Sequence, residues 1–131
     1  MIAAAQIQAA QTRERPSEAV VLSKAVTRAA DFLEVPNAVL ARVLGLSPAS
    51  ISRLKNGTFT LSPGTKPFEL AQLFVRLFRS LDAITGSDDN ASRSWLRARN
   101  LALNGQPIDL MQTVTGLTSV LGYVDSRRAP L

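Results

Sequence analysis

The sequence predicts an all-α protein, for three reasons. Apolar residues recur at three- and four-residue steps along most of the chain, which is the spacing of one helical face. Runs in which β-branched and polar residues alternate strictly, the pattern of half-buried strands, are absent from the sequence. Apolar residues make up 46% of the 131 residues and charged residues 19%, so we expect the chain to fold around a core.

The first sixteen residues mix alanine, glutamine and charged side chains and end at Pro16. We expect a flexible arm or a frayed helix there, because such a segment offers little to pack against a core. Arg13 and Arg15 are weak evidence for a DNA minor-groove contact, and a plain arm is the better interpretation.

The first firm helix is predicted over residues 17–33. Ser17 and Glu18 open it, and Pro36 marks its end because a proline disfavours helix at the residue before it. We expect its apolar stripe to support the next two helices from behind. The stripe comprises Val21, Leu22, Ala25, Val26, Ala29, Phe32 and Leu33.

Residues 37–57 are predicted to form two short helices joined by a tight turn. Gly45 ends the first helix, because glycine adopts a left-handed backbone without a steric penalty. Ser47 caps the second helix and is followed by a proline, whose ring is already fixed near the helical φ. Ala41, Gly45 and Ile51 have the spacing of a helix-turn-helix, which needs a small residue at the crossing, a turn, and an apolar plug.

The outward side of this second helix carries small or hydrogen-bonding side chains and two cations, as expected of a helix that lies in the major groove of DNA. Residues 37–57 hold three cations and no acid, which we interpret as an unopposed positive face. The alternative is an αα-hairpin that packs and binds nothing; the caps and the acid-free face favour DNA binding. The predicted DNA contacts are Ser47, Ala49, Ser50, Ser52, Arg53, Lys55 and Asn56. The segment resembles the Xre/Cro-type helix-turn-helix, most specifically in its ending SISRLKNG.

A loop is predicted over residues 58–67 from its Ser, Thr, Pro and Gly content. Thr58, Thr60 and Lys66 are candidates for phosphate contacts, and a plain solvated linker is an equal alternative.

Residues 67–85 are predicted to form the longest helix. Its apolar residues spread over more than one face: Leu70, Leu73, Phe74, Val75, Leu77, Phe78, Leu81 and Ile84. Such a helix must meet more than one partner surface, so it either runs through the middle of the monomer or also forms a dimer interface. We favour a homodimer, because two-fold symmetry matches two DNA half-sites.

Three further helices are predicted after Gly86. One begins at Ser87 or Asp88, with its acids at the positive end of the helix and with Trp95 and Leu96 in the core. Arg93, Arg97 and Arg99 are expected to face solvent or a partner. Asn104-Gly105 forms a turn, Pro107 starts a short helix, and a last helix runs from about Gly116 with Leu117, Val120, Leu121 and Val124 inward.

The second half carries a second, more specific resemblance, over roughly residues 80–128. Its signature is Trp95-Leu96-Arg97, then Asn100, the run Ala102-Leu103-Asn104-Gly105-Gln106-Pro107-Ile108-Asp109-Leu110, then Thr113 and Gly116. This order resembles the toxin-binding domain of MbcA/ParS/Xre antitoxins. The resemblance implies a dimeric antitoxin that binds a RES-type, ADP-ribosyltransferase-like toxin, blocks its active site and represses the shared operon. It also implies that the toxin consumes NAD or transfers a group from NAD.

The same resemblance suggests where the toxin would be held. The candidate contacts are Asn104, Gly105, Gln106, Pro107 and Asp109, together with the tail residues Arg127, Arg128, Pro130 and Leu131. The alternative for the first group is architectural, since Gly105 and Pro107 can simply shape a corner between helices. We therefore divide the chain into a flexible arm (residues 1–16), an Xre-like helix-turn-helix domain (residues 17–65), and a long helix with a toxin-binding and dimerisation domain (residues 66–131).

Composition limits the remaining functions. The net charge of +5 and a pI near 10.7 favour polyanionic partners. The sequence has no Cys and no His, which excludes disulfides, thiol nucleophiles, imidazole acid–base chemistry and most zinc sites. We expect no enzymatic activity, no metal site and no cofactor. The sequence has no apolar stretch long enough to span a membrane and no signal peptide, so we expect a cytoplasmic protein.

These observations predict a type II antitoxin that neutralises its toxin and, as a transcriptional repressor, regulates its own operon. The first alternative is a stand-alone dimeric Xre-type repressor whose second half only dimerises. The second is an inhibitor or adaptor whose helix-turn-helix has become scaffold.

Overall fold

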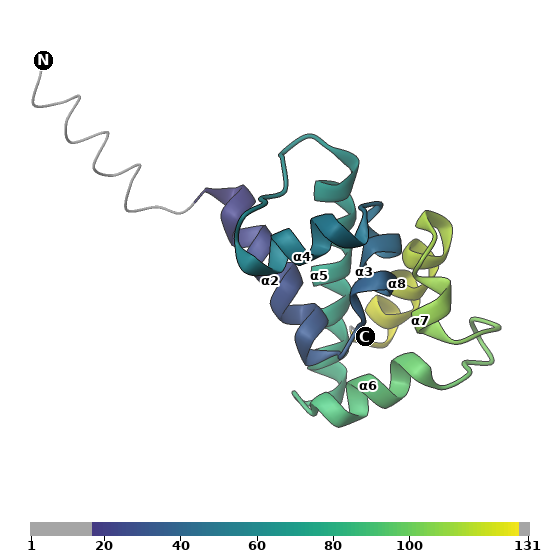
Figure 1. Ribbon diagram of the computed structural model, residues 1–131. Coiled ribbons are helices and arrows are strands. Elements are labelled where there is room, and N and C mark those ends of the chain that lie inside the picture. Colours follow the sequence, from purple (N-terminus) through teal and green to yellow (C-terminus); the bar gives the residue numbers. More distant parts are fainter. Residues whose placement is uncertain (1–16, 129–131) are drawn as a thin grey trace, which may run out of the picture.

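The computed structural model describes residues 17–128, which are helical apart from the connecting turns (Figure 1). An isolated pairing of Asn100 with Gly105 is the only β-type contact within this range. The prediction of an all-α fold is confirmed. The helices are α2 (Glu18–Phe32), α3 (Asn37–Leu44), α4 (Pro48–Asn56), α5 (Lys66–Thr85), α6 (Asp89–Arg97), α7 (Pro107–Leu110) and α8 (Val114–Arg128).

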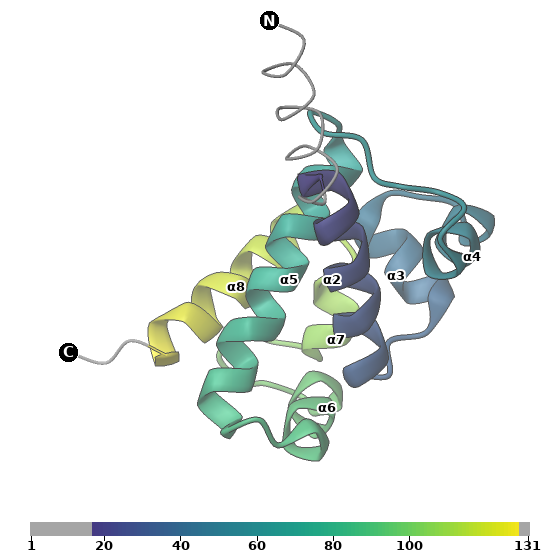
Figure 2. The ribbon, with the colours of Figure 1, turned by 90° about the vertical axis from the view of Figure 1, so that its left-hand side faces the viewer.

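Helix α5 lies at the centre of the molecule. It packs against α2 and α3 on one side and against α8 and α6 on the other, and Figure 2 shows it between α8 and α2. Phe74 and Leu77 of α5 are completely buried, within one core cluster that draws on both halves of the chain. The wide apolar surface of this helix is therefore covered largely within the monomer, which is the first of the two explanations that its sequence allowed.

Helix α2 buries a narrower face than its sequence predicted. Val26 and Leu33 are in the core, as expected, but Val21 is 52% exposed and Phe32 is 49% exposed. Both residues lie at the edge of the contact with α5: the Phe32 ring stacks on Phe78 of α5 at a centroid distance of 5.8 Å, and Val21 lines an open pocket together with Val75. The buried hydroxyl of Ser23 accepts a hydrogen bond from the amide of Leu61, which ties the loop before α5 to α2.

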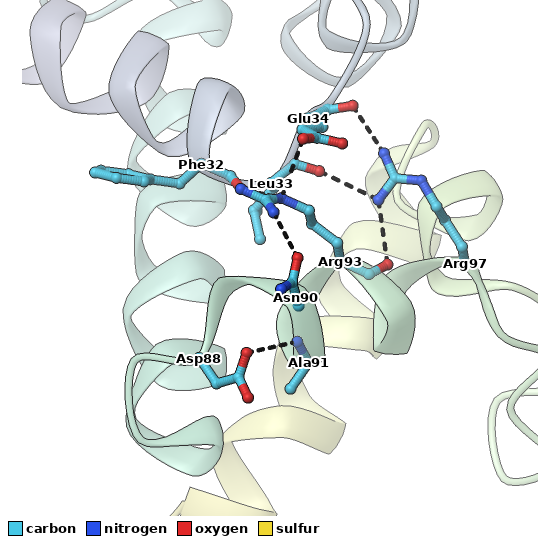
Figure 3. A network of polar contacts seen from close by, with 8 residues as sticks. All are labelled: Phe32, Leu33, Glu34, Asp88, Asn90, Ala91, Arg93 and Arg97. Atoms are coloured by element: carbon cyan, nitrogen blue, oxygen red, sulfur yellow. Dashed lines mark hydrogen bonds and ion pairs between the residues drawn. The ribbon is translucent and has the colours of Figure 1, made fainter.

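The C-terminal end of α2 is held by two arginines of α6 (Figure 3). Arg93 Nε donates to the carbonyl of Phe32 at 2.8 Å. Arg97 donates to the carbonyls of Leu33 and Glu34 at 3.2 and 2.7 Å. The last carbonyls of a helix have no partner within it, so guanidinium groups satisfy them and complement the negative end of the helix dipole. The expectation that Arg93 and Arg97 face solvent or a partner is wrong, because both bind the preceding half of the chain.

Replacing Arg97 by alanine is expected to lower the free energy of unfolding by about 1–2 kcal/mol, because two carbonyls lose a charged donor. Urea denaturation followed by circular dichroism measures the change. The matched control is Arg28→Ala, which removes the same charge from an exposed position of α2 and is expected to change the stability by less than about 0.5 kcal/mol. Equal effects of the two substitutions would show that the carbonyl contacts do not stabilise the fold.

Helix α8 packs along α5 and begins two residues earlier than predicted, at Val114. Leu117, Val120, Leu121 and Val124 are buried, as the sequence indicated. A polar contact accompanies this packing: Ser80, fully buried in α5, donates to Asp125 at 2.7 Å. Within residues 17–128, no helix is long and apolar enough to cross a membrane.

Candidate functional site

The helix-turn-helix has the geometry that its spacing predicted. Gly45 follows α3 in the left-handed conformation, with φ of 68° and ψ of 34°. Ala41 and Ile51 are buried where α3 and α4 meet. The Ser47 hydroxyl accepts the amide N–H of Ser50 at 3.1 Å and so caps α4. Local signals thus fix the angle at which α4 leaves the body of the protein.

The outer face of α4 is open to solvent. Of the predicted DNA contacts, Ser50 is half-buried and the others are exposed: Ser47, Ala49, Ser52, Arg53, Lys55 and Asn56. The face combines hydroxyls, an amide and two cations, which are groups that can donate to phosphate oxygens and to the acceptors of guanine and adenine. In Figure 2, α4 lies on the opposite side of the molecule from α8.

Neighbouring side chains organise part of this face. Arg53 Nη2 lies 3.4 Å from Ser50 Oγ, and the Asn56 side-chain oxygen accepts from the hydroxyl of Thr58 at 2.6 Å. Thr58, Thr60 and Lys66 of the following loop are exposed, and Lys66 is paired with Glu69 at 2.9 Å. Lys55, the other cation of α4, is paired with Asp31, so Arg53 is the cation of this helix best placed to reach outward.

The expectation of an unopposed positive face is wrong for one of its three cations. Asp31, at the end of α2, approaches Lys55 to 3.4 Å. The acid lies outside residues 37–57 in sequence and is brought there by the packing of α2 against α4. Arg42 donates to the side chain of Gln112, so it links the helix-turn-helix to the second half of the molecule.

The second candidate region is the corner formed by the loop after α6 and the short helix α7. Asn104, Gln106 and Asp109 are exposed, Gly105 is half-buried and Pro107 is buried. The exposed three can meet a partner directly. Pro107 has its ring inside the corner, which agrees with the architectural alternative for this residue.

The predicted tail residues lie at or beyond the end of α8. Arg127 and Arg128 are exposed, and the guanidinium of Arg127 lies 5.1 Å from the ring centre of Tyr123. Arg128 Nη1 lies 3.3 Å from Ser80 Oγ. Pro130 and Leu131 are outside the described residues, as are Arg13 and Arg15 of the arm.

Two features of the second half of the chain were not predicted from the sequence. Trp95, expected in the core, is half-buried and stacks on Tyr123 at 6.1 Å, and both line an open pocket of about 390 Å³ between α5, α6 and α8. Leu101, in the loop after α6, is 88% exposed. The signal for Leu101 was present, since it is an apolar residue inside a turn-rich segment.

Each candidate region lies within the range of a matching protein-family model. Residues 12–76 match the family model of the antitoxin Xre-like helix-turn-helix domain. Residues 80–129 match that of the antitoxin Xre/MbcA/ParS C-terminal toxin-binding domain. Neither model describes a family of enzymes. A search of curated proteins finds no matching relative.

Proposed function

The chain belongs to the Xre/MbcA/ParS antitoxins, and from this premise we propose that it neutralises a RES-type toxin and represses its own operon. The match of residues 80–129 to a toxin-binding domain carries the first part. The open face of α4 supports the second. We propose that the toxin is an ADP-ribosyltransferase-like enzyme that consumes NAD, and that the antitoxin blocks access to its active site.

In the toxin complex, we place the corner around α7 against the toxin, with Asn104, Gln106 and Asp109 as polar contacts. The basic end of α8 is suited to approach a pocket that holds an anionic dinucleotide, because Arg127 and Arg128 are exposed there. Since α4 and α8 lie on opposite sides of the molecule (Figure 2), toxin and DNA can be bound at the same time.

On DNA, we propose that a homodimer presents two copies of α4 to two half-sites of the operator. Arg53 is the residue we assign to base edges, and Ser47 and Ser50 lie beside it at the N-terminal end of the helix. Helix N-termini and hydroxyls commonly bind phosphates, which fixes the position of the helix in the groove.

The toxin part is tested by expressing the adjacent gene with and without this protein while recording growth and cellular NAD. We expect NAD to collapse with the neighbour alone and to recover on co-expression. A harmless neighbour, or a toxic one that this protein does not rescue, would contradict the antitoxin function and favour a stand-alone repressor. Toxicity with unchanged NAD, rescued by this protein, would retain the antitoxin and reject the RES assignment.

The DNA part predicts that Arg53→Ala weakens operator binding by about 1–3 kcal/mol and changes base preference at one position of each half-site, if Arg53 binds a guanine edge. Titration of fluorescent promoter fragments at several salt concentrations measures the loss. A uniform loss over all sequences, with a shallower salt dependence, would make Arg53 a phosphate contact instead.

Arg127→Ala is the matched control for this titration, because it removes the same charge from the end of α8, remote from α4 (Figure 2). An equal loss with both substitutions would indicate that net charge, rather than the face of α4, holds the DNA. If the unaltered protein fails to shift its own promoter at low salt with toxin present, repression is excluded and the protein acts only as an inhibitor.

A further inference from the structure

Leu101 is the most exposed of the large hydrophobic residues between residues 17 and 128. Its exposed fraction is 88%, whereas the other exposed ones, Val21, Phe32, Ile84 and Val114, range from 44 to 58%. A single exposed leucine is ordinary on a protein surface and by itself indicates nothing. What distinguishes Leu101 is the backbone that carries it and the domain in which it lies.

The loop around Leu101 is held in one shape by hydrogen bonds across its base. The amide of Asn100 donates to the carbonyl of Gly105 at 2.8 Å, and the Asn100 side-chain oxygen accepts the amide of Leu103 at 3.0 Å. Arg99 also donates to the side chain of Asn104 at 3.0 Å. The tip is therefore preorganised, and little conformational entropy remains to be lost when it meets a partner.

The two leucines of the loop have opposite positions. Leu103 is half-buried and packs against the core, which attaches the loop to the body of the protein. Leu101 points away from the core, with exposed Ala102 beside it. In Figure 1 the segment between α6 and α7 projects from the body. Intramolecular packing thus accounts for Leu103 and leaves Leu101 without a role within the monomer.

We propose that Leu101 is the apolar anchor by which the antitoxin docks on its toxin, inserting into an apolar depression on the toxin surface. The inference rests on the proposed function and adds a residue to the site. Leu101 lies inside the segment that matches a toxin-binding domain. Exposed Asn104 and Gln106 follow it along the chain and supply a polar rim, and an apolar centre inside a polar rim is the usual anatomy of a protein interface.

The test measures binding to the purified product of the adjacent gene, immobilised for biolayer interferometry. Leu101→Ser is expected to weaken the affinity about 10- to 100-fold, the loss that corresponds to exposing one leucine side chain. Leu101→Met restores an apolar side chain of similar size and is expected to stay within about threefold of the unaltered protein. Val21→Ser, which removes another exposed apolar side chain from the other half of the molecule, should leave binding unchanged.

A further variant tests whether the preorganised shape of the loop contributes to binding. Asn100→Ala removes the side-chain acceptor of Leu103 but keeps Leu101, so we expect a smaller loss, about three- to tenfold. Promoter binding and thermal unfolding of each variant report whether the rest of the fold is intact, and we expect no change for Leu101→Ser because its side chain is exposed.

The outcomes distinguish failure of the proposed function from failure of the Leu101 anchor alone. If the unaltered protein does not bind the toxin, the proposed function and the anchor both fail. If it binds and Leu101→Ser binds equally well, the anchor alone is overturned. A loss for Leu101→Ser that Leu101→Met does not restore would also overturn it, because an apolar depression accepts either side chain.

Discussion

Substitution of Gly116 by alanine is expected to lower the free energy of unfolding by about 3 kcal/mol, the upper end of the usual cost of overpacking. A Cβ atom at this position would lie 1.8 Å from the carbonyl oxygen of Leu110 and 2.7 Å from its carbonyl carbon. Both are backbone atoms at the end of α7, so no side-chain rotation relieves the clash. Helix α8 or α7 must move, and the corner that carries the candidate toxin contacts moves with it.

The same helix supplies the control for this substitution. A Cβ at Gly122 would meet no atom within 4 Å. Gly122→Ala is therefore expected to stabilise the protein by about 0.5–1 kcal/mol, since alanine is the better helix former. Urea denaturation of both variants measures the difference. Similar stabilities for Gly116→Ala and Gly122→Ala would mean that the approach of α8 to α7 is not as close as the structure has it.

Truncation of Phe74 to alanine is expected to cost about 3–5 kcal/mol, because it opens a cavity in the middle of α5. Phe74 is fully buried, and α5 packs against helices from both halves of the chain. We therefore expect both halves to lose stability together, in one cooperative transition at a lower urea concentration.

Two probes distinguish this result from independent unfolding. Trp95, the only tryptophan, reports on the second half by its fluorescence, and circular dichroism reports on all helices. Coincident transitions are expected for the unaltered protein and for Phe74→Ala. Phe32→Ala is the matched control, with an expected loss below about 1.5 kcal/mol, because the ring of Phe32 is half exposed. Separate transitions for the two probes would contradict a shared core.

The helix-turn-helix could be predicted almost residue by residue because its signals are local. Gly45 sets the turn through its own backbone and Ser47 caps the next helix through a bond three residues away. The burial of Ala41 and Ile51 follows from their spacing along the chain, which places both residues where α3 and α4 meet. Apolar spacing along α8 identified its inward residues in the same way.

Contacts between distant segments could not be predicted in this way. The sequence predicts that Arg93 and Arg97 face solvent or a partner. No residue near them in the sequence indicates that the end of α2 lies within reach of their side chains. Asp31 neutralises part of the α4 face from outside the segment that suggested DNA binding. Each of these depends on which helices pack together, which the periodicity of a single helix does not specify.

In the candidate toxin site, too, local features could be predicted from the sequence and the contacts that depend on the fold could not. The turn at Asn104 and the buried ring of Pro107 follow from local chemistry, and the family resemblance indicated the segment. That Leu101 projects from a closed loop while Leu103 packs inward depends on hydrogen bonds across the loop, which become visible only in the structure.

The central position of α5 also determines how truncation of the chain and proteolysis are expected to affect the protein. The two family matches end at residue 76 and begin at residue 80, and both positions fall within this helix, Lys66–Thr85. A premature stop codon after the first match would remove Leu77 with the rest of α5, and would leave the core around Phe74 open on the side that α8 covers. We expect the proposed DNA binding to be lost in such a truncated chain. By the same logic, a cellular protease that unfolds one half is expected to abolish both proposed activities, toxin binding and operator binding, together.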